Sequence, residues 1–400
     1  MTYDLIVVSS YPRLGTTRDK FTVGVADCTK QTLTSLPSET KILVLAEYLP
    51  DENPLIVDKN VTINRIWQRN SVGSFLKIFK EIQKHGDIPV LLEFEMAMYG
   101  NPVFNIFFVK LLFALKLASR KTYIVLHQVV TDFSEISGHI GNTKDSPING
   151  VLNILAKSFY KLVILFSTKI IVFEQFLKNR LDQNNPKIVV IPHGVEPQTI
   201  IQPPKKENLF TITVFGYLAW YKGTDWIIKA FSNYFDKHPN SKFKLVVAGG
   251  PNPNHLDKPY YQKYLSEIDT FSSKHPSKII VTGYVPESEI KKYYLESDLI
   301  VLPYRVGMSS SGPIAIAYAY HKPFLVSPKI SQSLDTPDIN QLVNKQMVKF
   351  SFEPKKLFQK LNYLSKHPQE LKKMSVMSQD IAIKRSWINI SQHYKQCLGL

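Results

Sequence analysis

Residues 301–327 read VLPYRVGMSSSGPIAIAYAYHKPFLVS, and the rest of the chain is arranged around this segment. The pattern predicts a buried strand over Leu299–Pro303, a polar turn over Arg305–Ser311, a helix over Pro313–Tyr320 and a second apolar strand after it. Proline is favoured at the first position of a helix. Such a helix presents unpaired amides and the positive end of its dipole to the space beyond the strand. The turn is therefore either a phosphate site or an ordinary polar loop.

Strands and helices alternate on both sides of this stretch. Apolar runs predict further strands at Asp4–Ser9, Lys41–Ala46, Val61–Trp67, Pro89–Phe94, Thr122–His127, Lys169–Phe173, Lys187–Ile191, Phe210–Phe215, Phe243–Ala248 and Ile279–Thr282. Helices are expected at Gly24–Leu36, Ser71–Lys84, Phe104–Ser119, Val151–Phe166, Gln175–Asn184, Thr224–Asp236, Tyr260–Phe271, Pro286–Glu296, Pro354–Ser365, Pro368–Ile383 and Trp387–Cys397. This alternation predicts an α/β protein with parallel sheets covered on both faces.

The chain is long enough for two domains, since it has 400 residues. The segment 197–208, PQTIIQPPKKEN, combines a diproline with charged residues, which is typical of a linker. We therefore expect an N-terminal domain over residues 1–198 and a C-terminal domain over 199–383. In such doubly wound sheets ligands bind at the carboxyl ends of the strands, so the predicted site is a cleft between the domains.

The composition limits the classes of molecule that the protein is expected to bind. A net charge of +16 indicates an anionic partner, but no zinc-finger spacing, RNP-like motif or basic–aromatic stripe points to nucleic acid. Two basic, strongly apolar segments, Phe104–Lys121 and Val151–Lys169, are either buried helices or helices that lie on an anionic membrane surface. Only Cys28 and Cys397 are cysteines, and the N-terminus lacks a signal-peptide pattern. We therefore expect a cytoplasmic protein, and, if the two helices lie on a membrane surface, one that is peripheral on the inner face of the plasma membrane.

Several segments together resemble the family 4 glycosyltransferases. They are SSYPRLGTTRDKFTVGVADCTKQTL (9–33), LLEFEMAMYGNP (91–102), YIVLHQVV (123–130), IVVIPHGV (188–195), FGYLAWYKGTDWIIKAF (215–231), VTGYVPESEIKKYYLESDLIVLPY (281–304) and SSSGPIAIAYAYHKP (309–323). The last segment resembles the phosphate turn of one subgroup. Together these segments span most of the chain, and they follow one another in the order usual for the family. The resemblance implies the GT-B fold, in which two Rossmann-like domains face each other and the C-terminal helix, here 384–400, packs back on the first.

The resemblance assigns donor-binding roles mainly to the second domain. Lys222, followed by a glycine, matches the family's phosphate-binding lysine, and the amides around Ser310, Ser311 and Gly312 supply a second clamp. Gly24 either lets the backbone approach the donor or simply starts a helix. The segment Gly283, Tyr284 and Val285 lies in the region that binds base and ribose.

Catalytic roles fall to the first domain. His127 ends an apolar strand and corresponds to the histidine beside the transferred sugar. Glu95 matches an acidic family position and either contacts hydroxyl groups or carries a negative charge for the following helix. Glu93 lies on the same strand face as Glu95, because side chains alternate along a strand. The two carboxylates alone are compatible with a hydrolase, but the rest of the chain does not support that function. His193 is assigned to a turn near the hinge.

Four positions depart from the usual family pattern. Met308 and Ile316 stand where most members carry two glutamates, which puts the usual donor contacts in doubt. Tyr217 stands where the family commonly has an arginine that accompanies the phosphate-binding lysine. We hypothesise that Arg305 supplies the missing positive charge. His321 replaces a glycine, and a backbone with positive φ tolerates histidine poorly.

The resemblance implies a retaining enzyme that moves a hexose from a nucleotide-diphosphate sugar to a hydroxyl group of a glycan or lipid-linked acceptor. Such an enzyme would act in polysaccharide biosynthesis. No cofactor and no metal are expected, since no Asp-x-Asp site is present. Two alternatives stay open: a GT-B sugar-nucleotide epimerase, and a non-catalytic subunit that binds a nucleotide sugar or glycan.

Overall fold

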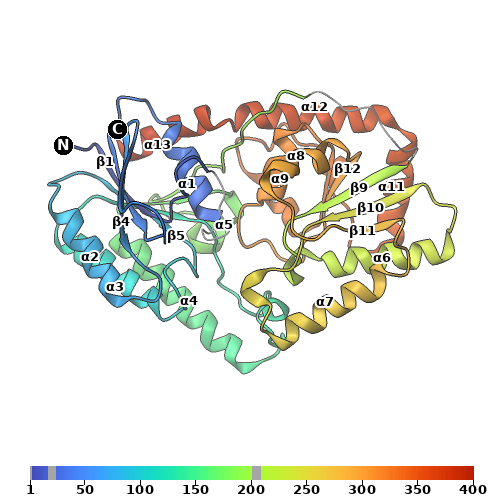
Figure 1. The fold of residues 1–400 in the computed structure, drawn as a ribbon, viewed down its shortest axis with the longest axis horizontal. Coiled ribbons are helices and arrows are strands. Elements are labelled where there is room, and N and C mark those ends of the chain that lie inside the picture. The colour runs from blue at the N-terminus through green and yellow to red at the C-terminus, as the bar shows by residue number, and fades with distance from the viewer. Residues whose placement is uncertain (1, 17–23, 201–208) are drawn as a thin grey trace.

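A computed structural model describes residues 2–16, 24–200 and 209–400. Two α/β domains lie side by side, and α12 (Pro368–Lys384) and α13 (Trp387–Leu398) run along one edge of the molecule from the second domain to the first (Figure 1). The predicted fold class is confirmed: each domain is built on a largely parallel sheet with helices on both faces.

The strands of the first sheet run in the order β3-β4-β2-β1-β5-β6-β7-β8. Their bounds are β1 (Leu5–Ser9), β2 (Ile42–Glu47), β3 (Leu55–Asp58), β4 (Val61–Trp67), β5 (Val90–Phe94), β6 (Thr122–Leu126), β7 (Lys169–Val172) and β8 (Ile188–Val190). The strands pair in parallel except for β3, which is antiparallel to β4. The chain order reverses between β1 and β5, and ligands bind at such a switch point.

The helices of the first domain divide between the two faces of this sheet. They are α1 (Gly24–Thr34), α2 (Val72–Gln83), α3 (Phe104–Leu117), α4 (Pro147–Phe166) and α5 (Gln175–Asp182), with the 3₁₀ turn η1 (Ser137–His139). On one face Phe108 and Val163 of α3 and α4 pack on Val8 and Leu92. These strand residues are fully buried, which explains why their sequences are continuously apolar.

The second sheet runs in the order β11-β10-β9-β12-β13, with parallel pairing. The strands are β9 (Phe210–Phe215), β10 (Phe243–Ala248), β11 (Ile279–Val281), β12 (Leu299–Leu302) and β13 (Phe324–Val326). The helices are α6 (Thr224–Lys237), α7 (Pro259–Ser272), α8 (Glu287–Leu295), α9 (Gly312–Ala319), α10 (Lys345–Val348), α11 (Pro354–Lys366), α12 (Pro368–Lys384) and α13 (Trp387–Leu398). The 3₁₀ turns are η2 (Trp220–Lys222), η3 (Pro253–His255) and η4 (Ile330–Asp335). The switch point lies between β9 and β12.

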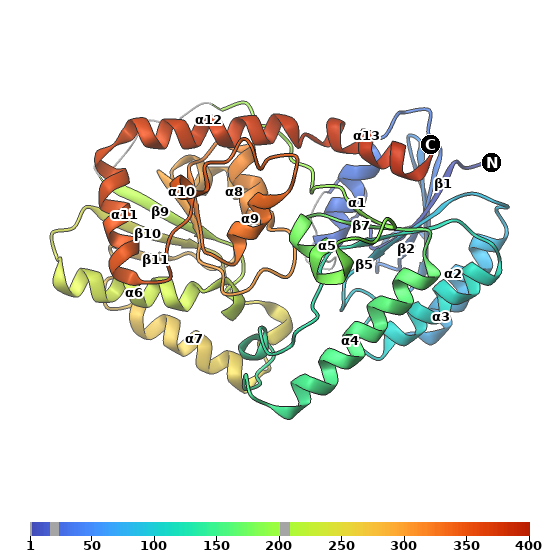
Figure 2. The same cartoon turned by 180° about the vertical axis from the view of Figure 1, so that it is seen from behind.

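The chain crosses between the domains at two adjacent places. Val195, before the predicted linker, pairs with Ser386, which lies between α12 and α13, in a parallel bridge. A Cβ atom at Gly194 would lie 2.1 Å from the Trp387 ring, so a glycine allows the two crossings to come together. Beyond this point α13 packs on the first domain, where Trp387 and Tyr394 join the core of Leu5 and Val7 (Figure 2).

The sequence predictions differ from the structure in a few places. The strand β3 was not predicted, because its short Asp58–Val61 turn uses Lys59 at a φ of 56° instead of a glycine signal. The helix α4 begins at Pro147 rather than Val151, since proline takes its first position. The predicted strand Thr122–His127 ends at Leu126, which leaves His127 at its carboxyl end. Residues 201–208 of the predicted linker lie outside the described residues.

Candidate active site

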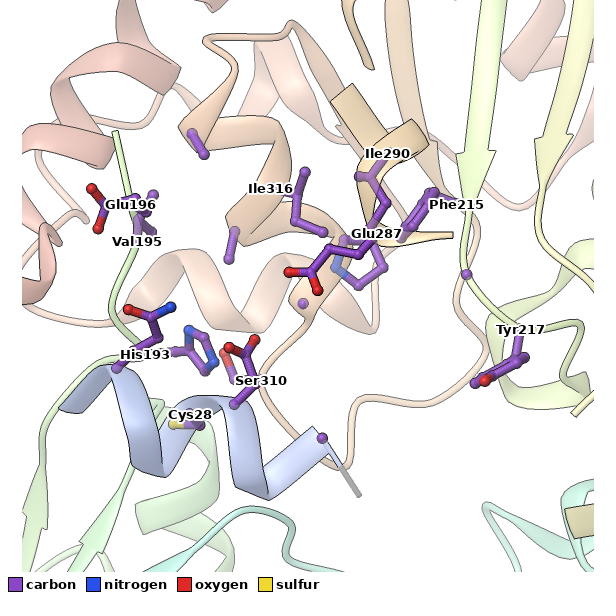
Figure 3. Close-up of a pocket in the computed structure, with 18 of the residues that line it drawn as sticks. Cys28, His193, Val195, Glu196, Phe215, Tyr217, Glu287, Ile290, Ser310 and Ile316 are labelled. Carbon is purple, nitrogen blue, oxygen red and sulfur yellow. The ribbon is translucent and has the colours of Figure 1, made fainter. Parts of the chain in front are cut away.

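A cavity of about 770 Å³ lies between the domains, at the carboxyl ends of both sheets (Figure 3). Its walls include residues that directly follow β5, β6, β9 and β10, namely Glu95, His127, Gly216 and Gly249. These strands lie at or next to the switch point of each sheet, where open parallel sheets bind their ligands. The volume is within the usual range for small-molecule sites, roughly 300–1,000 Å³.

Glycines form the wall of the second domain where β9 and β10 end. Gly216 has a φ of 109°, a conformation that residues with side chains rarely adopt. A Cβ atom there would lie 2.5 Å from Lys222 Nζ, and one at Gly249 would lie 2.1 Å from the Gly216 carbonyl oxygen. Glycine at both positions therefore leaves room for Lys222 and exposes backbone to whatever occupies the cavity.

Lys222 ends the turn η2 and lines this wall. The next residue, Gly223, has a φ of 70°, and a Cβ atom on it would lie 1.9 Å from the Pro303 carbonyl oxygen. Burial lowers the pKa of Lys222 to about 8. Within residues 2–16, 24–200 and 209–400 no carboxylate forms an ion pair with its ammonium group. An anion in the cavity would therefore stabilise the charged form of Lys222.

The N-terminus of α9 lies beside Lys222 in the same wall. Ser311 is the N-cap residue with an extended backbone, and Pro313 occupies the first turn, as predicted. Ser310, Gly312 and Pro313 line the cavity. The first turn of a helix carries unpaired N–H groups and a partial positive charge, so this part of the cavity suits a phosphate group.

The turn before α9 contacts the first domain directly. Ser310 Oγ donates to Glu174 Oε1 at 3.1 Å, and Thr336 Oγ1 donates to the other carboxylate oxygen at 2.7 Å. The Val129 amide donates to the Met308 carbonyl oxygen at 2.9 Å. Burial raises the pKa of the Glu174 carboxyl, while nearby Arg385 opposes this effect. These contacts fix the position of the turn relative to the first domain.

His127 lines the opposite wall and is held by a buried carboxylate. Its Nε2 lies 2.6 Å from Glu93 Oε2, and the Glu93 side chain is buried under the cavity wall. The Phe173 ring contacts the imidazole edge to face at 5.0 Å between centroids. A carboxylate at Nε2 stabilises the tautomer with a proton on that atom, which leaves Nδ1 as the acceptor.

Glu95 and Gly24 also line the wall of the first domain. Burial raises the pKa of Glu95, and the charges of His127 and Arg69 partly offset this. Gly24 is the first residue of α1, and a Cβ atom there would meet nothing within 4 Å. Packing within the described part of the protein therefore does not require glycine at this position. Residues 17–23 of the predicted opening loop lie outside the described residues.

Tyr217 lies at the side of the cavity away from His193 (Figure 3), and Tyr284 lines the cavity beside it. Tyr217 and Tyr284 have ring centroids 6.3 Å apart and an interplanar angle of 27°, so they are roughly parallel. Val285 lines the cavity next to them. Parallel aromatic rings at an open edge form a surface on which a planar base can stack.

A carboxylate lies near one of the two positions that lack the family glutamates. Ile316 on α9 lines the cavity, and the Glu287 side chain, from the first turn of α8, lies beside it (Figure 3). Met308, at the other position, packs against the apolar interdomain cluster of Val130, Ile136 and Val306. Met308 therefore contributes to the contact between the domains rather than to the cavity wall.

Three predicted donor-site residues do not line the cavity. Arg305 forms a two-point ion pair with Asp225, at 2.7 and 2.6 Å, and also donates to the Trp220 carbonyl oxygen. This prediction is corrected, because the guanidinium of Arg305 supports the η2 turn instead of facing the site. The Ser311 hydroxyl is buried against Tyr304 OH at 3.2 Å, and Gly283 precedes the lining residues Tyr284 and Val285. Neither Ser311 nor Gly283 is part of the cavity wall, although each is next to residues that are.

The backbone at His321 has the positive φ that the family pattern predicts for this position. His321 has a φ of 49°, in the left-handed region where glycine is usual. Its carbonyl oxygen accepts a hydrogen bond from Ser375, so α12 supports this strained residue at the end of α9.

The sequence reasoning missed several residues of the site. Glu93 was noted only as a neighbour of Glu95, although its strand position next to β6 places it against His127. From the sequence Tyr217 is only the replacement of an arginine, and no local pattern indicates Glu287 or Glu174. The signal for Tyr217 and Tyr284 was two aromatic residues that follow the strands on either side of β10, by two and three residues respectively.

Comparisons with known proteins agree with this geometry. HepE of Anabaena, in complex with UDP, matches with 15% identity over 100% of both chains and a TM-score of 0.64. Trehalose-6-phosphate synthase OtsA matches with 11% identity over 99% of this chain and 98% of that chain, with a TM-score of 0.72. Sucrose-phosphate synthase of Thermosynechococcus elongatus matches with 11% identity over 98% of both chains, with a TM-score of 0.69. No curated protein matches by sequence.

The two facing parallel-sheet domains, with a cavity at their switch points, therefore define the GT-B fold of glycosyltransferases. Within this fold, residues 210–365 match the family described as glycosyl transferases group 1. That match contains Lys222, the α9 N-terminus and the tyrosine pair.

Proposed function

We propose that the protein is a retaining glycosyltransferase that moves a hexose from a nucleotide-diphosphate sugar to a hydroxyl group of a glycan or lipid-linked acceptor. One observation carries this proposal: Lys222 and the α9 N-terminus line the same cavity as His127 and Glu95. An anion-binding wall thus faces a wall with a histidine and a carboxylate. The group 1 match and the fold support the same reaction class.

The second domain would hold the diphosphate of the donor. Lys222 and the amides around Gly312 would neutralise the negative charge that builds on the diphosphate as the glycosidic bond breaks. Because these groups are fixed before the donor arrives, their orientation costs nothing during the reaction. This charge makes a metal ion unnecessary in the proposed mechanism. Activity should therefore persist in a chelator.

The first domain would hold the sugar. His127, oriented by Glu93, would accept or donate a hydrogen bond at a sugar hydroxyl, and Glu95 would contact a hydroxyl of sugar or acceptor. The acceptor oxygen attacks the anomeric carbon on the face that the diphosphate leaves. The C1–O bond to phosphate breaks, the C1–O bond to the acceptor forms, and the acceptor proton passes to the leaving phosphate oxygen. The anomeric configuration is retained.

The nucleoside would occupy the end of the cavity at Tyr217 and Tyr284. The base would stack on this pair, and the Glu287 carboxylate would accept hydrogen bonds from the ribose hydroxyls in place of the glutamate absent at Ile316. HepE, which resembles this chain in fold, is bound to UDP in its structure. UDP-sugars are therefore the first donors to test.

A non-catalytic binding subunit is the second candidate, and Ile316 favours it, because an apolar side chain stands at a donor-contact position. Thermal shift against UDP-, GDP- and ADP-sugars identifies the ligand. Release of free sugar or transfer of the sugar to an acceptor then distinguishes an enzyme from a binding subunit. A binding subunit would be stabilised by the nucleotide sugar but would not turn it over. NMR of the product reports the anomeric configuration.

The tyrosine pair offers a sharper test of the donor orientation. Stacking of a base on an aromatic side chain is worth about 1–3 kcal/mol, so Tyr284→Ala should weaken UDP binding by roughly fivefold or more. Binding of inorganic pyrophosphate should not change in the same variant. Calorimetry of both ligands checks this, with Tyr363→Ala on α11 as a control at an exposed tyrosine outside the cavity. An equal loss for both ligands would contradict the assignment.

A further inference from the structure

The helices α3 and α4 cover one face of the first sheet and lie next to each other (Figure 1). Phe108 and Leu112 of α3, and Tyr160 and Val163 of α4, are buried in the core beneath them. Both helices are thus firmly attached to the domain along one side. Their other sides face outward.

The outward sides of these helices are apolar. The exposed large hydrophobic residues here are Val103, Ile106, Phe113 and Leu117 near and on α3, and Ile148, Val151, Ile154, Leu155, Leu162 and Leu165 on α4. Ile154 and Leu117 are 68% and 70% exposed. Phe113 contacts Phe166 at 5.2 Å between ring centroids, which joins the two helices. Single exposed apolar residues are ordinary, but a contiguous group of this size marks an interaction surface.

The charged residues of the two helices all have the same sign. α3 carries Lys110 and Lys116, α4 carries Lys157 and Lys161, and neither helix contains an aspartate or glutamate. All four lysines are exposed. Lys157 and Lys161 are four residues apart, so they lie along one edge of the apolar stripe of α4. This surface therefore combines apolar side chains with positive charge at its border.

α4 is long and apolar enough to cross a membrane, judged by its length and composition alone. Its packed side argues against a spanning orientation, because Tyr160 and Val163 are buried against the sheet. A helix with one side attached to a folded domain, and an apolar outer side bordered by lysines, lies in the plane of the membrane interface. Lysines near such a surface attract anionic lipid headgroups.

We propose that the outward face of α3 and α4 docks on an anionic lipid bilayer. The apolar side chains enter the boundary between headgroups and acyl chains, and the four lysines contact the lipid phosphates. This surface is distinct from the nucleotide cavity. The proposal does not require sugar transfer, and it deepens the proposed function by favouring the lipid-linked class of acceptor.

The position of α4 connects this surface with the cleft. The chain from His127 to Pro147 includes η1, which contacts the second domain: a Cβ atom on Gly138 would lie 2.4 Å from the Trp220 ring. The N-terminal end of α4 thus points toward the place where the domains meet, as seen from behind in Figure 2. A lipid-linked acceptor embedded beside α4 would have its headgroup near the mouth of the cleft.

Vesicle flotation with the full chain and no donor tests the docking surface. Wild-type protein should float with vesicles of phosphatidylcholine and phosphatidylglycerol, and should float at least about tenfold less with phosphatidylcholine alone. The double variant Ile154→Asp/Leu155→Asp should lose flotation by about tenfold or more. The matched control Val376→Asp/Ile383→Asp changes two similarly exposed apolar residues of α12 and should float like the wild type.

Charge reversal separates the electrostatic contribution from the apolar one. Lys157→Glu/Lys161→Glu should reduce flotation with anionic vesicles by about tenfold, whereas Lys355→Glu/Lys366→Glu on α11 should not. Failure of the wild type to float would overturn the proposal, as would equal flotation of wild type and the α4 variants. Resistance to alkaline carbonate extraction would instead identify a spanning helix, and loss of a dimer in the Ile154 variant would identify a protein interface.

A nucleotide-binding measurement keeps the outcomes apart. Every α4 and α12 variant should be stabilised against heat as much as the wild type by the nucleotide sugar that the thermal-shift screen identifies. None of the changed residues lines the cavity. Lost flotation with unchanged ligand response would support the surface alone. Flotation in a protein that shows no nucleotide response would support the surface and contradict the proposed function.

Discussion

The two walls of the cavity are built in different ways. In the second domain the part of the wall around Lys222 consists mainly of backbone: glycines at the ends of β9 and β10, and the amides at the start of α9. In the first domain the wall consists of side chains, with Glu95 and His127 at neighbouring strand ends and Glu93 behind them. The first arrangement suits a diphosphate, which is the same in every donor. The second suits hydroxyl groups, whose positions differ from sugar to sugar.

This difference predicts that changes in the two walls affect different quantities. A change in the backbone wall should alter binding of the nucleotide diphosphate. A change in the side-chain wall should alter turnover and leave nucleotide binding intact. The three predictions below test this separation, in order of decreasing effect.

Lys222→Ala should have the largest effect. A hydrogen bond to a charged group contributes about 1.5–3 kcal/mol, so the affinity for UDP should fall roughly 10- to 100-fold. Calorimetry with UDP measures this directly. Lys229→Ala on the outer side of α6 provides a matched control and should bind UDP normally. Unchanged affinity in Lys222→Ala would show that the second-domain wall does not hold the diphosphate.

Glu93→Gln should reduce kcat by about tenfold and leave UDP affinity unchanged, because the carboxylate orients His127 without reaching the cavity. Steady-state kinetics measure kcat, and calorimetry with UDP measures the affinity. Glu267→Gln on α7, at an exposed position, should change neither kcat nor UDP affinity. A parallel loss of UDP affinity would break the separation of the two walls.

The pH dependence of UDP binding should be smaller. The pKa of Lys222 is lowered to about 8 by burial, so the protein without ligand holds a charged lysine below that pH and loses the charge above it. A bound diphosphate favours the charged form. The affinity should therefore fall as the pH rises, by about fourfold between pH 7 and pH 8.5. Lys222→Arg stays charged and should show a flat profile over this range; a wild-type profile without slope would contradict the assignment.

Local signals account for what the sequence predicted correctly. The turn at Lys222-Gly223 and the serine–glycine–proline start of α9 are properties of neighbouring residues, and both lie where the pattern placed them. The burial of whole strands likewise follows from continuous apolar runs such as Leu5–Ser9. For these elements the physical cause is contained within a few residues.

Contacts between distant segments account for what the sequence did not predict. The pairing of Glu93 with His127 depends on the register of β5 with β6. Arg305 was assigned to the diphosphate because its partner, Asp225, lies far away in the chain and its proximity requires the folded domain. The contact of Glu174 with Ser310 likewise joins two domains. Such partners cannot be assigned until the topology is known.

The docking of α13 has a consequence for biosynthesis. Trp387, Ile390 and Tyr394 complete the core around Leu5 and Val7, although they are translated after the second domain. Domains generally fold in the order in which they leave the ribosome. Here the first domain keeps an uncovered apolar face until α13 has been made, so we expect the second domain to reach its final form first. A premature stop before residue 387 would thus leave the first domain unfinished, rather than the second.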